Sequence, residues 1–356
     1  MEYTEMLEQY DRDRGLYDDL AASMSSLIGV LIASSGVSPH SISSRVKERT
    51  SIARKIEKKD KYDSLNQITD IVGIRIITHY SDEVDKIAEI IETEFNVDIE
   101  NSVDKRSILD PDRFGYLSLH YVVSIKPERS KLLEYKRFAD FKFEIQIRSI
   151  LQHTWAEIEH DIGYKAKVEV PKPIRRKFSR LAGLLELADD QFVQIRDDLI
   201  GYENAIRRNI GKDPENIGID AVTIFEYVNR SQKLKELDEK VAQLASLDLK
   251  PLDKGDAGRH VKYLEYFGIE SISELEQELI ENEDFILCRA SDIGSGDRKR
   301  KTASQGISIF YLHQVLAAKR FNKEELMTFL NEMNLSGVGE REEFANYLSN
   351  FLGSDA

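Results

Sequence analysis

The chain has 356 residues, of which 41% are hydrophobic and 32% charged, a composition typical of a soluble, helix-rich protein with two structural units. Its single cysteine, Cys288, excludes an intrachain disulfide and a cysteine-based metal cage, so a cytoplasmic location is expected. The net charge of −14 argues against a protein that coats nucleic acid generally. Salt limits the range of each charge, so a local basic site is still compatible with this negative total.

The first 40 residues predict an N-terminal helical segment. Apolar residues recur at helical spacing through about residues 3–35, and a Ser/Gly/Pro stretch at 34–43 ends the pattern. The longest apolar run, residues 27–33, is too short to cross a bilayer, and acidic residues precede it where a signal peptide would carry basic ones. We therefore expect no membrane association.

A second helix is predicted at about residues 44–59. Lys47, Ser51 and Lys55 are four apart and would share one face, with Lys58 beside them. A cationic stripe with a hydroxyl at its centre suits a polyphosphate chain. A solvated basic face is the simpler alternative for this stretch taken alone.

The next segment, residues 68–78, is apolar on both faces and predicts a central strand. Asp70 lies at its entry, where a carboxylate costs free energy unless it has a partner, and Mg²⁺ is a natural one. Further strands are predicted at 97–103, 117–125 and 141–149, and a helix at about 150–165. Strands interleaved with helices indicate an α/β or α+β domain with a mixed sheet flanked by helices.

The predicted strand at 141–149 carries a row of polar side chains. Strict alternation places four of them on one face: Lys142, Glu144, Gln146 and Arg148. A strand-borne glutamate in such a row is how metal-dependent phosphoryl and nucleotidyl transferases present a second carboxylate, although a strand with one wet face gives the same pattern. Ahead of it, Tyr116 follows the turn residue Gly115 and offers a ring for stacking on a base.

From residue 173 onward the pattern is helical. An apolar stripe runs over several turns, through Ile174, Phe178, Leu181, Leu185, Ala188, Phe192, Ile195 and Leu199. The remainder to residue 356 also predicts a mainly helical C-terminal region, and it carries no catalytic constellation. Arg298–Lys301 form a basic run that could contact an RNA backbone but is more simply a solvated loop.

Five ordered motifs over about 120 residues carry a resemblance. They are R-x-K-x-x-x-S-x-x-x-K from Arg45, D-I-V-G-I-R from Asp70, G-Y-x-S-L-H from Gly115, E-I-Q-I-R from Glu144 and H-x-W-A-E-I-E-H-x-x-x-Y-K from His153. This set resembles the synthetase domain of the RelA/SpoT family and is similar to the small alarmone synthetases. The resemblance covers about residues 41–167. Together with the helical patterns outside it, four parts are expected: a helical segment at 1–40, a synthetase domain at 41–170, a long helical extension at 171–250 and a helical region of unknown role at 251–356.

The resemblance implies a nucleotidyltransferase-like fold and an ATP-dependent pyrophosphokinase that makes (p)ppGpp from a guanosine nucleotide. The ATP phosphates would be held by Arg45, Lys47, Ser51 and Lys55, with Arg45 and Arg75 also near the adenine. Asp70 and Glu144 would bind Mg²⁺, and Glu144 would also accept the proton of the attacking 3′-hydroxyl. The acceptor site would consist of Tyr116, His120, Gln146 and Arg148. Short relatives often assemble into oligomers, so a homo-oligomer is expected.

Asp70 and Arg75 are five residues apart, an odd number, so in a regular strand their side chains would point to opposite faces. Asp70 is therefore expected just before regular pairing begins, or Arg75 serves the site from its edge. The approach to Tyr116 also departs from the family's lysine-rich pattern, because it contains Asp110 and Asp112.

Three alternatives follow. The acidic approach disfavours the 5′-phosphates of a nucleotide, so one alternative is a toxin-type relative that pyrophosphorylates the 3′ end of tRNA. A second is an inert nucleotide-binding module, which the presence of both carboxylates argues against. A third, a metal hydrolase built on His153, Glu157 and His160, lacks the His-Glu-x-x-His spacing and a third ligand.

Overall fold

The computed structural model describes residues 3–59, 62–104, 118–165, 171–210, 217–295, 301–335, 337 and 340–351. The chain divides into two compact units, Met1–Asp197 and Asp198–Ala356. Each unit has its own hydrophobic core. The four-part division expected from the sequence stays a prediction.

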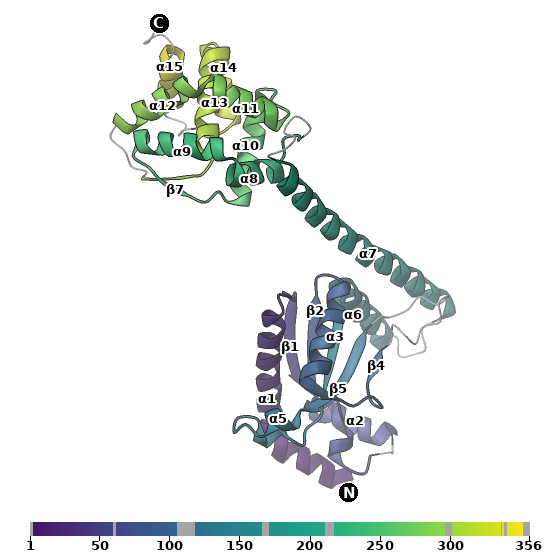
Figure 1. The fold of residues 1–356 in the computed structure, drawn as a ribbon. Helices are drawn as coiled ribbons and strands as arrows, with labels where there is room; N and C mark the ends of the chain where they lie inside the picture. The colour runs from purple at the N-terminus through teal and green to yellow at the C-terminus, as the bar shows by residue number, and fades with distance from the viewer. Residues whose placement is uncertain are drawn as a thin grey trace. The chain divides into compact units, whose positions relative to one another are not determined.

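A mixed β-sheet forms the centre of the first unit (Figure 1). Its strands are β1 (Ser41–Val46), β2 (Val72–Thr78), β3 (Phe95–Val97), β4 (Val103–Asp104), β5 (Leu119–Ile125) and β6 (Phe143–Ser149). The order is β1-β2-β6-β5-β3, with β4 also paired to β5. Only β2 and β6 pair in parallel; the other pairs are antiparallel. The expected α/β fold with a mixed sheet flanked by helices is confirmed.

Helices cover the apolar face of this sheet. The helices of the unit are α1 (Tyr3–Ser34), α2 (Arg49–Lys59), α3 (Asp82–Glu94), α5 (Pro127–Ser130), α6 (Ile150–Lys165) and the start of α7 (Lys172–Asn209). In Figure 1, α1 and α3 lie against the strands. The core between them contains Met24, Ile87, Ile74, Phe143 and Ile145. Polar residues of the same strands therefore face the opposite side, where the site lies.

Helix α1 is long and apolar enough, by length and composition alone, to cross a membrane. Its residues Leu20, Met24, Ile28 and Ile32 are nevertheless fully buried in the core of the first unit. Helices at the centre of soluble proteins pass the same test. The packing on the sheet thus accounts for the apolar composition of α1.

Two elements differ from the sequence prediction. The single strand expected at 97–103 is wrong, because residues 98–102 form a turn between the short strands β3 (Phe95–Val97) and β4 (Val103–Asp104). The expected helix at 44–59 is wrong over its first residues, because Ser41–Val46 form strand β1 and α2 begins only at Arg49. In β1, Ser44 pairs with Ile74 and Val46 with Val72 of the buried strand β2. The hydrogen bonds of this edge pairing override a helical preference that is weak in Ser- and Val-containing stretches.

The second unit is mainly helical, as predicted. Its helices, besides the end of α7, are α8 (Ala221–Arg230), α9 (Gln232–Ala245), α10 (Lys254–Tyr266), α11 (Ile272–Glu281), α12 (Glu283–Ser295), α13 (Ile307–Arg320), α14 (Lys323–Glu332) and α15 (Arg341–Phe351). Two short strands, β7 (Asp248–Lys250) and β8 (Thr302–Ser304), pair in parallel. Helix α13 is the most buried of these helices, with Ile309, Leu312 and Val315 inaccessible to solvent.

Candidate functional site

Two rows of side chains cross the polar face of the sheet. In the first row, Arg45 of β1 is paired with Gly73 of β2, which is paired with Glu144 of β6. The Arg45 side chain lies against Gly73, since a Cβ there would be 3.9 Å from Arg45 Cγ, an ordinary van der Waals contact. In the second row, Arg75 is paired with Gln146, which is paired with His120. Paired residues point to the same face, so these predicted site residues line one surface.

Asp70 lies in the turn just before β2, which begins at Val72. The expectation that it precedes regular pairing is confirmed. Its Oδ2 is 2.5 Å from Lys47 Nζ, and its Oδ1 is 2.7 Å from Lys55 Nζ. Burial would raise the pKa of Asp70, but the hydrogen bonds and charges of the two lysines outweigh it and hold that pKa below its ordinary value. Asp70 is therefore ionised at neutral pH.

Lys47 reaches the site from the connection between β1 and α2, and not from a helix. Its backbone N–H donates to Ile71 O over 2.8 Å, and its carbonyl accepts from Tyr10 Oη of α1 over 2.7 Å. These two bonds fix the backbone, so the ammonium is held beside Asp70. Burial lowers the pKa of Lys47, and the neighbouring Asp70 opposes this only in part.

Glu144 is oriented from both sides. His120 Nδ1 is 2.8 Å from Glu144 Oε1, and Gln146 Nε2 donates to Glu144 Oε2 over 2.9 Å. Arg148 Nη2 in turn donates to Gln146 Oε1 over 2.5 Å. An ionised carboxylate only accepts, so Nδ1 of His120 carries the proton. Burial would raise the pKa of Glu144, but the bonds from His120 and Gln146 hold it below its ordinary value.

The two carboxylates lie close enough to act on each other. The charge of Asp70 opposes the lowering of the Glu144 pKa, and the charge of Glu144 favours the ammonium form of Lys47. Two carboxylates are the hard oxygen ligands that Mg²⁺ takes in nucleotide enzymes. Among the described residues no cluster of three or more His, Cys, Asp or Glu could hold a metal. A magnesium ion at Asp70 and Glu144 fits if nucleotide phosphates and water complete its shell.

A second group of charges lies further along β2 and on α6. Arg75 Nη1 is 3.0 Å from Glu157 Oε1, and His153 Nδ1 is 3.8 Å from the same oxygen. Burial lowers the pKa of His153, and the charges of Arg148 and Arg75 lower it further. His153 is therefore neutral at physiological pH and adds no charge near Arg75 and Arg148.

The structure thus brings together most of the residues expected from the sequence. Around the two carboxylates lie Lys47, Lys55, His120, Gln146 and Arg148. Ser51 is on α2, one turn before Lys55. Tyr116 lies outside the described residues. The roles assigned to all of these residues stay predictions.

Two contributors were not expected from the sequence. Tyr10 acts from α1, 37 residues before Lys47, and no local pattern links the two. The sequence placed Glu157 only in the disfavoured metal-hydrolase alternative with His153 and His160, and its ion pair with Arg75 depends on how α6 packs against β2. The spacing of His153 and Glu157, one helical turn apart, was the single available signal.

Comparison with known proteins identifies the region that carries this site. Residues 44–169 match a family model described as "Region found in RelA / SpoT proteins". GTP pyrophosphokinase YwaC of Bacillus subtilis is 29% identical over 160 residues, covering 44% of this chain and 73% of the relative. GTP pyrophosphokinase YjbM of the same organism is 27% identical over 176 residues, covering 47% and 76%.

Among solved structures, small alarmone synthetase 1 of Bacillus subtilis aligns with a TM-score of 0.46 at 22% identity. The alignment covers 55% of this chain and 99% of that one. The residues matched by the family model, 44–169, include Lys47, Asp70 and Glu144. Residues 44–169 of this chain therefore match the RelA/SpoT family, and the site lies within this matched region.

Proposed function

We propose that the first unit is a pyrophosphokinase that transfers the β,γ-diphosphate of ATP to the 3′-hydroxyl of GTP or GDP, with release of AMP. The observation that carries the proposal is that Asp70, paired with Lys47 and Lys55, lies within electrostatic range of the oriented carboxylate of Glu144. Two carboxylates next to two ammonium groups provide a metal site and a cradle for a triphosphate in one place. The curated relatives named above, which match this region, are GTP pyrophosphokinases.

The donor site is formed by β1, its connection to α2 and α2 itself. Lys47 and Lys55 are paired with Asp70, and phosphate oxygens offer them the same kind of partner. Ser51 adds a hydroxyl one turn from Lys55 on α2. Arg45 lies over Gly73 in the neighbouring row, where its planar guanidinium can stack on the adenine. Arg75, in the next row, would serve the adenine from the other side.

Asp70 and Glu144 would hold one Mg²⁺, which neutralises charge on the β- and γ-phosphates when it is bound. Both side chains are about three-quarters or more shielded from solvent, which strengthens their hold on a cation. Asp70 supplies its carboxylate once the lysines have moved to phosphate oxygens. Glu144 keeps its hydrogen bonds to His120 and Gln146, so its orientation is fixed before the substrates bind.

The acceptor hydroxyl would attack the β-phosphorus of ATP. A bond forms between the ribose 3′-oxygen and the β-phosphorus, the bond from that phosphorus to the oxygen bridging it to the α-phosphate breaks, and AMP leaves. Glu144 takes the hydroxyl proton. Because the pKa of Glu144 is lowered, it is a weak base, so the proton moves late and the carboxylate acts mainly by orienting the hydroxyl.

His120 and Arg148 would complete the acceptor pocket. His120 Nε2 is buried and has no hydrogen-bond partner in the described part of the chain, so it can accept from a ribose or base N–H or O–H. Tyr116 would stack on the guanine. With ATP and a guanosine nucleotide as substrates, we expect the activity in the cytoplasm.

The proposal is tested by incubating the full chain with γ-labelled ATP, Mg²⁺ and one acceptor at a time: GTP, GDP or bulk tRNA. We expect label in a guanosine nucleotide together with equimolar AMP. Label found on tRNA alone would show that the acceptor is the 3′ end of RNA, and it would overturn the assignment of a guanosine nucleotide as acceptor. Release of labelled phosphate without transfer, or no AMP with any acceptor, would overturn the transferase itself.

A further inference from the structure

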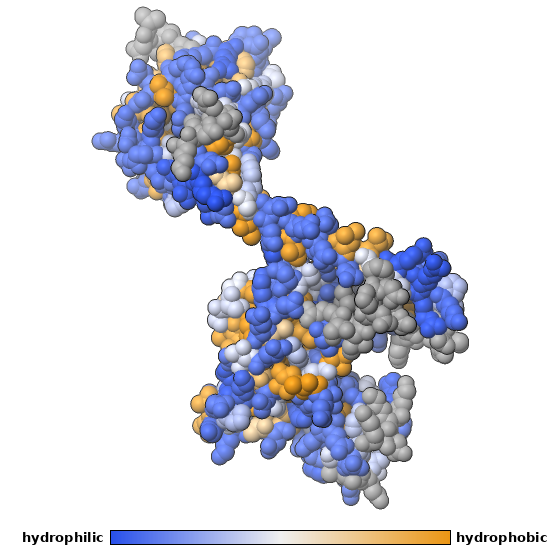
Figure 2. Space-filling model, turned by 45° about the vertical axis from the view of Figure 1, so that its right-hand side comes forward, coloured by the Kyte–Doolittle hydropathy of each residue, from blue (hydrophilic) through white to orange (hydrophobic). Residues whose placement is uncertain are grey.

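Helix α7 buries an aspartate while it exposes leucines. Asp189 is 3% exposed, whereas Leu184 and Leu187 of the same helix are 64% and 58% exposed. Figure 2 shows apolar side chains at the surface of this helix. Burying a carboxylate costs free energy, and burial raises the pKa of Asp189. The Asp189 side chain is therefore held inward by a specific partner and not by the hydrophobic effect.

That partner is Ser149, the fully buried last residue of β6. Ser149 Oγ donates to Asp189 Oδ2 over 2.6 Å and accepts from the backbone N–H of Gln152 over 3.2 Å. Gln152 Oε1 in turn accepts from the backbone N–H of Ser149 over 3.0 Å, which is the reciprocal pattern of a capping box at the start of α6. The hydroxyl has one hydrogen, so Asp189 fixes the direction in which it points. Asp189 thus holds the junction of β6 and α6.

The strand that ends at this junction carries the acceptor side of the site. Arg148 directly precedes Ser149, and its Nη2 donates to Gln146 Oε1 over 2.5 Å. Gln146 Nε2 donates to Glu144 Oε2 over 2.9 Å. These side chains follow one another at every second residue on one face of β6 and are linked by hydrogen bonds. A displacement of the strand end is therefore passed along the row towards Glu144.

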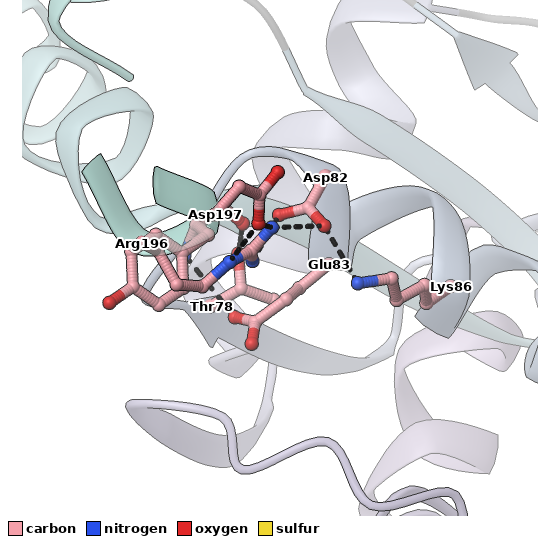
Figure 3. Close-up of polar contacts among 7 residues, drawn as sticks. Thr78, Asp82, Glu83, Lys86, Arg196 and Asp197 are labelled. Carbon is pink, nitrogen blue, oxygen red and sulfur yellow. Dashed lines mark hydrogen bonds and ion pairs between the residues drawn. The ribbon is translucent and has the colours of Figure 1, made fainter. Parts of the chain in front are cut away.

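A second contact of α7 leads to a different part of the first unit. Arg196 lies about two turns after Asp189, and both residues belong to the first unit. Arg196 donates to both carboxylate oxygens of Asp82, the first residue of α3, over 2.8 and 3.1 Å (Figure 3). Its guanidinium lies 4.7 Å from the ring centre of Tyr80. Arg196 thus holds α7 to the start of α3, whereas Asp189 holds it to the strand that carries Glu144.

We propose that Asp189 is a positioning residue for the acceptor nucleotide, which it serves by holding Ser149 and thereby the end of β6. The inference rests on the proposed function, because Arg148 is an acceptor residue of that reaction. Loss of the Asp189 carboxylate frees the Ser149 hydroxyl and loosens the strand end that carries Arg148. The donor residues Lys47 and Lys55 follow β1, which β2 separates from β6 in the sheet. The effect therefore falls on the acceptor and not on ATP.

Steady-state kinetics of the full chain with ATP and each acceptor tests this assignment. In Asp189→Ala we expect the KM for the acceptor to rise roughly tenfold, as is usual when a group that orients a functional side chain is lost, while the KM for ATP changes by less than about twofold. Damage to the fold alone lowers the amount of active enzyme, which reduces kcat and leaves both KM values unchanged. Equal rises in both KM values, or a loss confined to kcat, would overturn the proposal.

Two other α7 variants are matched controls. Asp190→Ala removes the same charge one residue away, where the side chain is exposed. Arg196→Ala removes the contact of the helix with α3. Both variants should keep the wild-type KM for the acceptor. A rise in Arg196→Ala that matches the rise in Asp189→Ala would show a general loosening of α7 and would overturn the route through Ser149.

A conservative replacement and a double variant test that route. Asp189→Asn retains an oxygen that can accept from Ser149 Oγ, so its KM for the acceptor should stay within about twofold of wild type. Ser149→Ala should raise this KM at least as much as Asp189→Ala does, and the double variant should be no worse than Ser149→Ala alone. Additive rises in the double variant, or an Asp189→Asn variant as impaired as Asp189→Ala, would contradict action through Ser149.

A measurement without turnover separates this inference from the proposed reaction. The Nε–Hε signal of Arg148 in heteronuclear NMR, assigned by its loss in Arg148→Lys, reports on the guanidinium that donates to Gln146. We expect this signal to shift or broaden in Asp189→Ala and to stay unchanged in Asp190→Ala. An unchanged signal in Asp189→Ala would overturn the positioning role. A shifted signal in a chain that transfers no diphosphate would overturn the proposed function alone and would support the hold of Asp189 on β6.

Discussion

Glu144→Gln is the most informative single change, because it removes one charge and keeps the shape of the side chain. Two donors converge on Glu144, from His120 Nδ1 over 2.8 Å and from Gln146 Nε2 over 2.9 Å. A glutamine can accept from only one of them and must turn its NH₂ toward the other. His120 can adapt by moving its proton to Nε2, which lets Nδ1 accept from the new amide.

The expected magnitudes for folding and catalysis differ. One weakened hydrogen bond at a mostly buried site costs about 1–2 kcal/mol of unfolding free energy. Loss of a carboxylate that positions the nucleophile and holds a metal lowers turnover by a factor of roughly 10² to 10⁴. That factor corresponds to about 3–5 kcal/mol in the activation barrier. The variant should therefore stay folded at 25 °C while losing nearly all transfer.

The assay is AMP release and label transfer at saturating ATP and acceptor, with a denaturant unfolding curve on the same sample. Glu128→Gln is the matched control, because Glu128 lies on the exposed helix α5, and it should leave both quantities unchanged. Turnover of Glu144→Gln within twofold of wild type would refute the role of this carboxylate. A loss of turnover that parallels a loss of folded protein would assign Glu144 to structure alone.

Three further predictions follow from the same contacts. Asp70→Asn should abolish transfer and remove the effect of Mg²⁺ on the affinity for a non-hydrolysable ATP analogue. Metal-free binding of the analogue should be retained or tightened, because the two lysines are freed. Unchanged Mg²⁺ dependence of the affinity, measured by calorimetry, would contradict this. The folded-state pKa of Asp70 lies below its unfolded value, so its contribution to stability is present above about pH 4 and is lost as pH falls through the folded pKa. The difference in unfolding free energy between wild type and Asp70→Asn should therefore shrink from pH 7 to pH 3. A difference that stays constant over this range would refute the prediction. Tyr116→Ala should raise the KM for the acceptor far more than that for ATP, and equal increases would exclude stacking on the guanine.

The strands β2, β5 and β6 could be predicted from the sequence because they carry strong local patterns. The apolar stretch through β2 and the alternation in β6 each specify which side chains face the core, and the polar row that includes Glu144 follows directly. Asp70 was identifiable because a carboxylate at the entry of a buried strand requires a partner. These features are set by residues within one element.

Contacts between distant elements could not be predicted in the same way. Strand β1 forms only because an edge of β2 is available to pair with it, so Lys47 was assigned to a helix. The bond from Tyr10 to the Lys47 carbonyl joins α1 to the site across 37 residues. Likewise, the stripe on α7 was visible as a helical pattern, but the sequence did not say that Asp189 and Arg196 would occupy the neighbouring face.

Manganese binding, followed by electron paramagnetic resonance, tests most directly whether Asp70 and Glu144 form one metal site. In the presence of a non-hydrolysable ATP analogue, we expect one Mn²⁺ per wild-type chain and at least a tenfold weaker Kd in Asp70→Asn and in Glu144→Gln. Wild-type affinity in both variants would contradict the two-carboxylate site and the reaction built on it.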